Sequence, residues 1–391
     1  MNRYLVVLGR KTTLAFAELQ TVLRRNEKAA SRISITPVHH TAIVESESEL
    51  DCKALMAILG GTIKIAVLGK RATSKNFPDR LVTILRNESI GKARLRFGIS
   101  LVGSRGANQR FLLPKILKAR LSHEKIETRF ILPRRSNELS SSQVKLVDLT
   151  ELYVVWSGTD IEIGKTVALQ DFEGFANRDY KRPYADPKTG MLPPKVARMM
   201  VNLAFPQKIR PTMWLLDPFC GTGTIAMEAL MLGMNTVSSD HSHKKVAGTR
   251  ANLTWLCKEE KWKTKWRVMQ GDATKVSQMI EIKVDAIVTE PFLGSPRFTA
   301  QKVPDIIKGL NKLYLGALKD WRKCLRKNGR VVMVIPEIRV GNLVKRADLV
   351  IDRCENLGYT LVAGPFEYDR PQARVRRQII VFEKQIARKV E

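Results

Sequence analysis

The stretch Leu215–Thr224, which reads LLDPFCGTGT, decides the fold of this chain. Its apolar first half predicts a buried strand, and the apolar residues 225–232 that follow it predict a helix. Gly221 and Gly223 lack a Cβ atom, so a ligand can lie against the backbone of the turn between these two elements. The free N–H groups at the start of the helix favour a ligand that carries a carboxylate. A single residue separates the two glycines, so the turn does not have the spacing of the dinucleotide-binding fingerprint.

Two acidic residues lie at the ends of the next two predicted strands. Residues 236–239 are followed by Asp240, and residues 266–270 are followed by Gly271 and Asp272. An acid that ends the strand after a glycine turn is placed to accept hydrogen bonds from both ribose hydroxyls of a nucleoside ligand. Each acid is also suited to capping the helix that follows it, and at Asp240 the two roles can coexist.

The composition predicts a protein of several domains with a polyanionic partner. The 391 residues are enough for about two or three domains. Lys and Arg number 67 against 38 Asp and Glu, which gives a formal net charge of +29. Cations that meet phosphates release counterions, so this excess favours a nucleic-acid partner, although a merely basic surface is the alternative.

Cysteine usage and hydropathy indicate a soluble, cytoplasmic protein. The 5 cysteines are scattered without metal-like spacing, which indicates reduced thiols and no metal site. The amino terminus does not have the pattern of a signal peptide, and no apolar run reaches membrane-spanning length. We therefore expect no membrane partner.

The amino-terminal half alternates strand-like and helix-like runs. Between Tyr4 and Leu68 their order is β-α-β-β-α-β, which predicts a small ferredoxin-like sandwich. From Arg71 onward the composition becomes basic, which would suit an RNA backbone, although a solvated charged face is an alternative. The predicted helices there are 77–86 and 110–123, the predicted strands are 93–102, 127–132, 144–149 and 151–157, and the candidate RNA-binding residues are Arg110, Lys115, Lys118, Arg134 and Arg135.

The carboxyl-terminal half predicts a parallel sheet that closes on a hairpin. Residues 170–190 are rich in charge, Gly and Pro and read as a connector, and residues 191–204 begin with prolines and continue as an amphipathic helix. Further predicted elements are the strand 285–289, the helix 306–326, the strand 329–335, the helix 343–356 and the strands 359–366 and 375–383.

Two motifs resemble a known family. The string D-P-F-C-G-T-G at 217–223 resembles motif I of the class I S-adenosylmethionine methyltransferases. The run K-R-P-Y at 181–184, followed by P-K-V-A-R-M-M-V-N-L-A at 194–204, resembles the segment that precedes motif I in the THUMP-containing tRNA (guanine-N2) methyltransferases. The basic block from Arg71 resembles their THUMP domain in order and composition, and the resemblance extends from Tyr4 to Lys384.

This resemblance implies an α/β fold of several parts. We expect an N-terminal ferredoxin-like domain at 1–70, a THUMP-like α+β RNA-binding domain at 71–168 and a linker at 169–190. A Rossmann-like class I methyltransferase domain is expected at 191–391. The implied cofactor is S-adenosyl-L-methionine, with Asp240 at the ribose and Asp272 at the adenine; the full set of expected cofactor-binding residues is Asp217, Pro218, Phe219, Cys220, Gly221, Gly223, Thr224, Asp240, Asp272 and Ala273.

The predicted catalytic segment is Glu290-Pro291-Phe292. Methyl transfer to an amine requires the nitrogen lone pair to face the sulfonium methyl, and hydrogen-bond acceptors that hold the two N–H groups favour the charge that develops. The resemblance assigns these roles to the Glu290 side chain and the Pro291 carbonyl, with Phe292 stacked on the base. The family pattern is T-D-P-P-Y-G, whereas residues 289–294 read T-E-P-F-L-G, so the acid is one methylene longer and the ring is displaced by one position.

The resemblance also implies contacts with tRNA near the cleft. Residues 370–379 resemble the family segment R-P-x-x-R-V-x-R-(E/Q)-I, whose arginines are candidates for phosphate contacts, with solubility as the alternative role. The expected RNA-binding residues of this half are Arg178, Lys181, Arg182, Arg374 and Arg376, and Arg377 lies in the same segment.

The predicted function is therefore methylation of a base amine in tRNA, with guanine N2 of the position-ten type as the first choice. The alternatives are a methyltransferase for base amines of ribosomal RNA or DNA, or a tRNA-binding protein whose methyltransferase fold is inactive through the change at 290–292. We expect a monomer, and the sequence leaves open whether a small activating protein subunit is needed.

Overall fold

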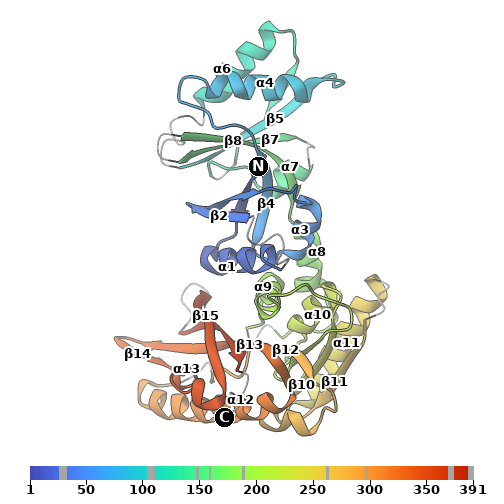
Figure 1. Cartoon of the computed structure of the whole chain (residues 1–391), viewed down its shortest axis with the longest axis vertical. Coiled ribbons are helices and arrows are strands. Elements are labelled where there is room, and N and C mark those ends of the chain that lie inside the picture. Colours follow the sequence, from blue (N-terminus) through green and yellow to red (C-terminus); the bar gives the residue numbers. More distant parts are fainter. Residues whose placement is uncertain are drawn as a thin grey trace. The chain divides into compact units, whose positions relative to one another are not determined.

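The computed structural model describes residues 1–25, 33–103, 109, 111–134, 136–146, 149–157, 160–186, 190–260, 264–295, 298–368 and 374–385. They form two compact units, each containing one sheet of eight described strands (Figure 1). Unit 1 comprises Met1–Thr12 and Glu27–Phe172, and unit 2 comprises Thr13–Asn26 and Glu173–Glu391. The finer division at residues 70, 168 and 190 stays a prediction.

The strands of unit 1 are β1 (Asn2–Leu8), β2 (Ile33–Val38), β3 (Thr41–Ser46), β4 (Thr62–Leu68), β5 (Leu95–Val102), β6 (Thr128–Phe130), β7 (Thr150–Ser157) and β8 (Asp160–Leu169). Their order in the sheet is β2-β3-β1-β4-β8-β7-β5-β6. In the first four, neighbours are antiparallel and β1 lies between β3 and β4, as a ferredoxin-like β-α-β-β-α-β order requires. β8 pairs with both β4 and β7 and so joins this part to the basic part in one sheet.

The helices of the amino-terminal half are α1 (Thr12–Leu23), α3 (Cys52–Ile58), α4 (Phe77–Ser89), α6 (Leu112–His123) and α7 (Ser141–Leu146). From Thr13 onward, α1 clusters with unit 2. α4 and α6 cover the basic part of the unit 1 sheet, because their apolar faces join one core. Leu81 of α4, Leu117 of α6 and Phe97 of β5 are fully buried in it.

Two predictions for unit 1 are corrected. The predicted strand 144–149 is corrected for its described residues 144–146, which belong to the helix α7. Its start is fixed by a capping box, in which Gln143 N–H donates to Ser140 Oγ and Ser140 N–H donates to Gln143 Oε1, both at 3.2 Å. The sequence also did not predict β8, whose alternation is blurred because its residues Ile161–Gly164 are buried on both faces.

The strands of unit 2 are β9 (Trp214–Asp217), β10 (Asn235–Asp240), β11 (Trp266–Gln270), β12 (Val284–Thr289), β13 (Leu325–Val340), β14 (Leu343–Arg346), β15 (Tyr359–Tyr368) and β16 (Val375–Lys384). Their order is β11-β10-β9-β12-β13-β16-β15, with β14 paired to β13. The strands from β11 to β13 are parallel, and β16 and β15 follow antiparallel. The predicted parallel sheet that closes on a hairpin is confirmed.

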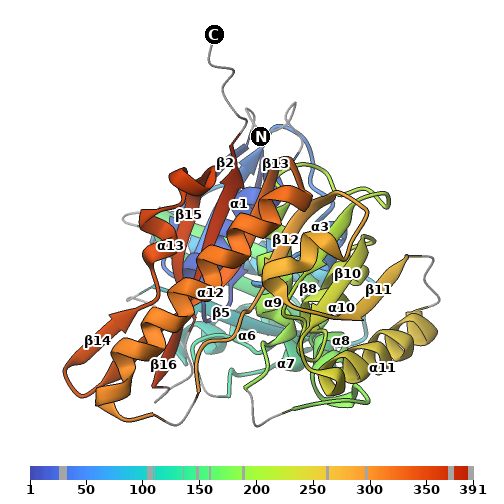
Figure 2. The ribbon, with the colours of Figure 1, turned by 90° about the horizontal axis from the view of Figure 1, so that it is seen from below.

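The α-helices of unit 2 are α8 (Phe172–Ala176), α9 (Pro194–Ala204), α10 (Thr224–Met231), α11 (His243–Glu260), α12 (Val303–Cys324) and α13 (Leu349–Asp352), with the π-helix η1 (Asn177–Lys181) and the 3-10 helices η3 (Ala273–Gln278), η4 (Ala300–Lys302) and η5 (Glu355–Leu357). α12 runs along one face of the sheet (Figure 2), where Tyr314 and Trp321 are fully buried with Phe382 of β16. α9 packs against β12 and β13.

The predicted helix 343–356 is also corrected. β13 continues to Val340, beyond the predicted end at 335, and turns through Gly341 and Asn342 into β14. Gly341 has a φ of 56°, which a glycine adopts without steric cost. A Gly-Asn pair between two strands is a hairpin signal that the helical reading of this segment overlooked. Only the short elements α13 and η5 are helical here.

No described helix combines the length and the apolar character needed to cross a membrane. Among the same residues, no group of three His, Cys, Asp or Glu side chains is arranged to share a metal ion.

Candidate functional site

The turn between β9 and α10 has the backbone that its two glycines allow. Gly221 and Gly223 have φ values of 54° and 79°, in the left-handed region that favours glycine. A Cβ atom on Gly223 would lie 2.8 Å from Thr249 Cγ2, so a larger residue would clash there. A Cβ on Gly221 would have only the Phe219 carbonyl within 4.0 Å, so the backbone at Gly221 faces open space. The turn therefore leaves room beside Gly221, as the sequence predicted.

Asp240 fastens this turn from the end of β10. Its Oδ2 accepts a hydrogen bond from Gly221 N–H at 3.1 Å, and its Oδ1 accepts one from Ser242 N–H at 2.9 Å. Asp240 is 9 % exposed, so the carboxylate is nearly buried, and both of its oxygens are oriented by main-chain donors. The Ser242 carbonyl accepts the first helical bond of α11, from Val246 N–H, so Ser242 and not Asp240 is the N-cap, and the alternative capping role of Asp240 is corrected.

Asp217 ends β9 and lies beneath the turn. It is 1 % exposed and accepts hydrogen bonds from Phe219 N–H at 3.2 Å and from the Thr289 hydroxyl at 2.8 Å. Burial raises the pKa of Asp217 to about 7, and the nearby negative charges of Asp240 and Glu290 add to this rise. Three carboxylates from the ends of β9, β10 and β12 thus converge at one edge of the sheet, where α/β folds bind their ligands.

Asp272 follows β11 at the same edge and acts as a cap. Its carboxylate accepts hydrogen bonds from Thr274 N–H and from the Thr274 hydroxyl, both at 2.8 Å, which lowers the pKa of Asp272. Gly271 N–H donates to the Asp240 carbonyl at 3.0 Å and ties this loop to β10. Asp272 is exposed and Ala273 is buried, so the carboxylate is accessible from the edge of the sheet.

The segment Glu290-Pro291-Phe292 continues directly from β12. Glu290 forms an ion pair with Arg377 of β16. Pro291 is buried, whereas the Phe292 ring is 58 % exposed. The Tyr314 hydroxyl of α12 donates to the Phe292 carbonyl at 2.6 Å, which holds the backbone so that the ring projects outward. An acid and an outward aromatic ring therefore flank one proline.

The segment predicted as a linker is packed into unit 2. Arg178 and Arg198 both bind the carboxylate of Glu228 on α10, with nitrogen–oxygen distances of 2.6 Å and 2.7 Å, and Glu228 is fully buried. Both guanidiniums also lie over the Phe175 ring, at 4.6 Å and 5.6 Å from its centre. Arg178 is 5 % exposed, so the prediction that it binds RNA is corrected.

Arg182 lies behind the glycine turn instead of on the surface. Its Nη1 donates to the Thr224 hydroxyl at 2.7 Å and lies 3.4 Å from the Thr222 hydroxyl. Arg182 is 4 % exposed, and burial lowers its pKa. The prediction of an RNA contact is therefore corrected here too. Asn252 closes the same junction, since its amide donates to the carbonyls of Tyr184 and Thr222, both at 2.8 Å.

The other predicted RNA-binding residues differ in exposure. Arg110 and Arg135 lie outside the described residues. Arg376 is half-buried, and the exposed members of the set are Lys115, Lys118, Arg134, Lys181 and Arg374. Arg134 lines a cavity of about 550 Å³ in unit 1 together with Lys64 and Glu138. Arg377, from the same segment as Arg374, is engaged by Glu290 and is a residue whose role the sequence did not reveal.

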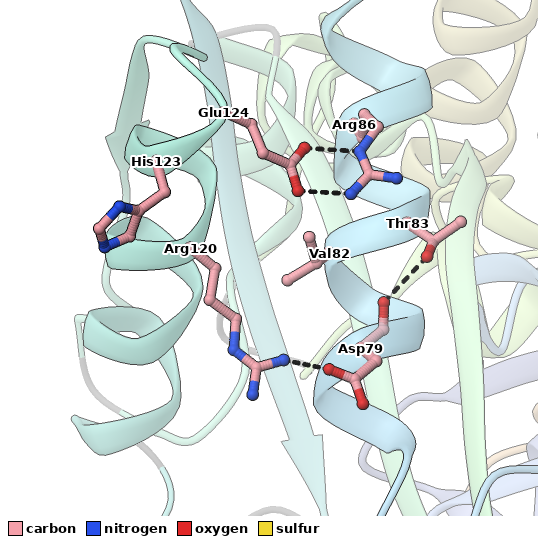
Figure 3. Close-up of a pocket in the computed structure, with 7 residues that line it drawn as sticks. All are labelled: Asp79, Val82, Thr83, Arg86, Arg120, His123 and Glu124. Atoms are coloured by element: carbon pink, nitrogen blue, oxygen red, sulfur yellow. Dashed lines mark hydrogen bonds and ion pairs between the residues drawn. The ribbon is translucent and has the colours of Figure 1, made fainter.

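A second cavity, of about 360 Å³, lies between α4 and α6. The Arg86 guanidinium pairs with Glu124, and Arg120 pairs with Asp79 across it (Figure 3). The ion pairs compensate the charges that line this cavity, so part of the basic character of α6 is not available to phosphates. His123 extends away from both pairs (Figure 3).

Comparison with known proteins identifies relatives of the chain. The family model of the RMKL-like methyltransferase domain matches residues 180–349. A tRNA (guanine(10)-N2)-dimethyltransferase of Methanothermobacter thermautotrophicus is 36 % identical over 159 residues, which cover 41 % of this chain and 42 % of that protein. A protein of Methanothermococcus thermolithotrophicus, named probable tRNA (guanine(10)-N2)-dimethyltransferase, is 32 % identical over 123 residues, 30 % of this chain and 70 % of that protein. The chain spans about half the length of the first curated relatives it matches.

Among solved structures, TrmN from Thermus thermophilus has a TM-score of 0.54 and 17 % identity, with 98 % of this chain and 99 % of that chain covered. At this identity the likeness supports the fold alone. The likeness extends over both units, because 98 % of this chain is covered.

Proposed function

Because the chain belongs to the tRNA (guanine(10)-N2)-dimethyltransferase family, we propose that it methylates the exocyclic amine of a guanine in tRNA, with S-adenosylmethionine as the methyl donor. The observation that carries this proposal is the convergence of Asp217, Asp240 and Glu290 at the carboxyl edge of the parallel strands, beside the glycine turn. A methyltransferase of this kind needs a nucleoside site and an amine site next to each other, and the three acids at this edge support such an arrangement.

The residues of the turn fit the proposed cofactor. The open space at Gly221 leaves room for a ligand against the backbone, and the start of α10 presents main-chain N–H groups to a carboxylate. Asp240 would accept the ribose hydroxyls and Asp272 the adenine amine, with the other residues of the turn lining the site. When bound, S-adenosylmethionine would supply an electrophilic methyl group on a sulfonium.

The segment after β12 would hold the target amine. The Glu290 carboxylate and the Pro291 carbonyl would each accept one N–H of the amine, which turns the nitrogen lone pair towards the glycine turn. Positive charge develops on nitrogen during transfer, so a carboxylate at this point stabilises the transition state more than the ground state. The exposed Phe292 ring would stack on the base. A proton can leave to solvent after transfer, so no base with an unusual pKa is required.

Unit 1 would bind the RNA as a THUMP-like module. The net charge of +29 and the exposed cations Lys115, Lys118 and Arg134 support this assignment. Lys181 and Arg374 would extend the contact to unit 2.

All 5 cysteines are free thiols, which is consistent with a role in the cytoplasm.

The test is incubation of the full chain with labelled S-adenosylmethionine and bulk tRNA, followed by mass spectrometry of the nucleosides. We expect N2-methylated guanosine, and Glu290→Gln as the matched control should suppress it. If the label appeared in another nucleoside, the methylated group would be the amine of a different base. Cofactor and tRNA binding without any label in RNA would favour the alternative of an inactive fold, in which the change at 290–292 has removed catalysis.

A further inference from the structure

Arg377 reaches Glu290 from a strand that is not adjacent in the sheet. Glu290 follows β12 and Arg377 lies on β16, and β13 separates these two strands. The Arg377 Nε donates to Glu290 Oε1, and its Nη2 donates to the Gly190 carbonyl at 3.0 Å. The guanidinium also lies 5.9 Å from the centre of the Tyr368 ring on β15. One side chain therefore connects the proposed amine-binding acid to three other parts of unit 2.

The pair is largely shielded from water. The side chains of Arg377 and Glu290 are 11 % and 17 % exposed. A guanidinium is planar, and its hydrogen bond to a carboxylate both orients the carboxylate and stabilises its negative charge. A free Glu side chain would sample several rotamers, so this bond selects one orientation of the acid before any substrate arrives.

The length of the acid explains why such an anchor is required. Residue 290 is a Glu, and its side chain has one methylene more than that of an Asp, which gives the carboxylate one more rotatable bond. The same methylene lets the carboxylate extend towards β16. A fixed contact at that distance would compensate for the freedom that the longer side chain gains.

We propose that Arg377 is the positioning residue of Glu290, which adapts the longer acid of this chain to the amine-binding role. This inference rests on the proposed function, because it assigns Arg377 to the acid that would hold the amine. It replaces the expectation that Arg377 binds a tRNA phosphate. Arg377 acts through Glu290 and does not touch the reacting atoms.

A second Arg–Glu pair in the same sheet provides a matched control. Arg330 of β13 binds Glu383 of β16 through Nε at 2.9 Å and donates through Nη1 to the Leu203 carbonyl at 3.2 Å. Their side chains are 19 % and 34 % exposed. Arg330→Ala thus removes an ion pair and a bond to a main-chain carbonyl, as Arg377→Ala does, from the same sheet and at a residue that does not contact Glu290.

The test measures single-turnover methylation of tRNA by the full chain and by the variants Arg377→Ala, Arg377→Lys and Arg330→Ala. Loss of orientation should slow Arg377→Ala by roughly 10- to 100-fold, with cofactor and tRNA affinities unchanged. Arg377→Lys keeps the charge without the planar fork and should recover part of the rate. Arg330→Ala should react at the parent rate. Thermal unfolding of each variant identifies any loss of folding, and Arg377→Lys carries the test if Arg377→Ala does not fold.

The double variant Glu290→Gln with Arg377→Ala separates positioning from an independent role. If Arg377 acts through Glu290, its removal should cost little more once Glu290 is Gln. Additive losses would overturn the inference, as would a parent rate in Arg377→Ala together with a weaker, less salt-dependent affinity for tRNA. A parent rate in Glu290→Gln alone would instead remove the catalytic role of Glu290, and no methylation by the parent would refute the proposed function itself.

Discussion

Asp240→Ala tests whether the acid at the end of β10 holds the ribose of the cofactor. In the protein, Gly221 N–H and Ser242 N–H each occupy one oxygen of this carboxylate, at 3.1 Å and 2.9 Å. These main-chain donors orient the carboxylate, and each oxygen keeps a further lone pair for a ribose hydroxyl. Removing the side chain would therefore delete the acceptor and also release the N–H of the glycine turn.

The expected cost follows from the kind of hydrogen bond that is lost. A hydrogen bond to a charged acceptor contributes about 1.5–3 kcal/mol net. In the variant, one of the two contacts with the ribose hydroxyls is lost and water replaces the other. The ligand should therefore bind roughly 10- to 150-fold more weakly. Isothermal titration of S-adenosylhomocysteine into the full chain measures this change without turnover. The 2′-deoxy analogue provides the complementary measurement, because it lacks one of the two hydroxyls.

Asp285→Ala is the matched control for a structural effect. Asp285 Oδ2 accepts the N–H of Trp214 at 2.8 Å, at the opposite end of the neighbouring strands β9 and β12. That variant should lose stability and keep cofactor affinity. The ribose assignment fails if Asp240→Ala binds S-adenosylhomocysteine as tightly as the parent. The ribose assignment also fails if Asp240→Ala weakens the binding of the 2′-deoxy analogue by the same factor as the binding of S-adenosylhomocysteine.

Three further perturbations give separate readings of the site. Glu290→Ala should reduce the single-turnover rate by roughly 100-fold with unchanged tRNA affinity, and a parent rate in rapid-quench experiments would exclude its role. Arg178→Ala should lower the free energy of unfolding in urea by about 3 kcal/mol, because Glu228 would keep a single partner; an unchanged midpoint would contradict this. The pKa of Asp217 is raised from 3.8 to about 7, so its contribution to stability is full below pH 3.8 and is lost as the pH rises through about 7. Asp217→Asn should therefore reduce the change in melting temperature between these pH values. If the variant and the parent showed the same pH dependence, the Asp217 carboxyl would not be its cause.

The centre of the unit 2 sheet could be predicted because β9, β10 and β12 are largely buried on both faces, whereas the edge strand β11 is not. Such strands read as continuous apolar runs, and the polar residue at the end of each one marks the edge where ligands bind. Asp217 was found in this way, whereas Asp240 was found by its position one βα unit after the glycine turn and Glu290 by the resemblance of residues 289–294 to a family pattern. The residues at the strand ends thus indicated where in the sheet the site lies.

Short elements could not be predicted from periodicity, because a few residues fit more than one period. The run before Leu149 suits a strand by composition, yet the bonds between Ser140 and Gln143 begin a helix there. The residues after Gly341 suit a helix, yet the turn at Gly341 and Asn342 continues β13 into β14. In both cases a pair of turn or cap residues decides the structure, and the pattern of apolar residues does not.

The arginines of the presumed connector show a different limit. A basic run reveals charge but not the direction in which each side chain points, and Arg178 points into unit 2 whereas Lys181 faces solvent. The missing information lies on α10, in which Glu228 is the single charged residue among apolar ones. A carboxylate buried in an apolar helix requires cationic partners, because an isolated buried charge is strongly unfavourable. Glu228 on the buried helix α10 therefore predicts that some nearby arginines form buried ion pairs that stabilise the fold. The cations that remain for RNA binding are those without a buried acidic partner.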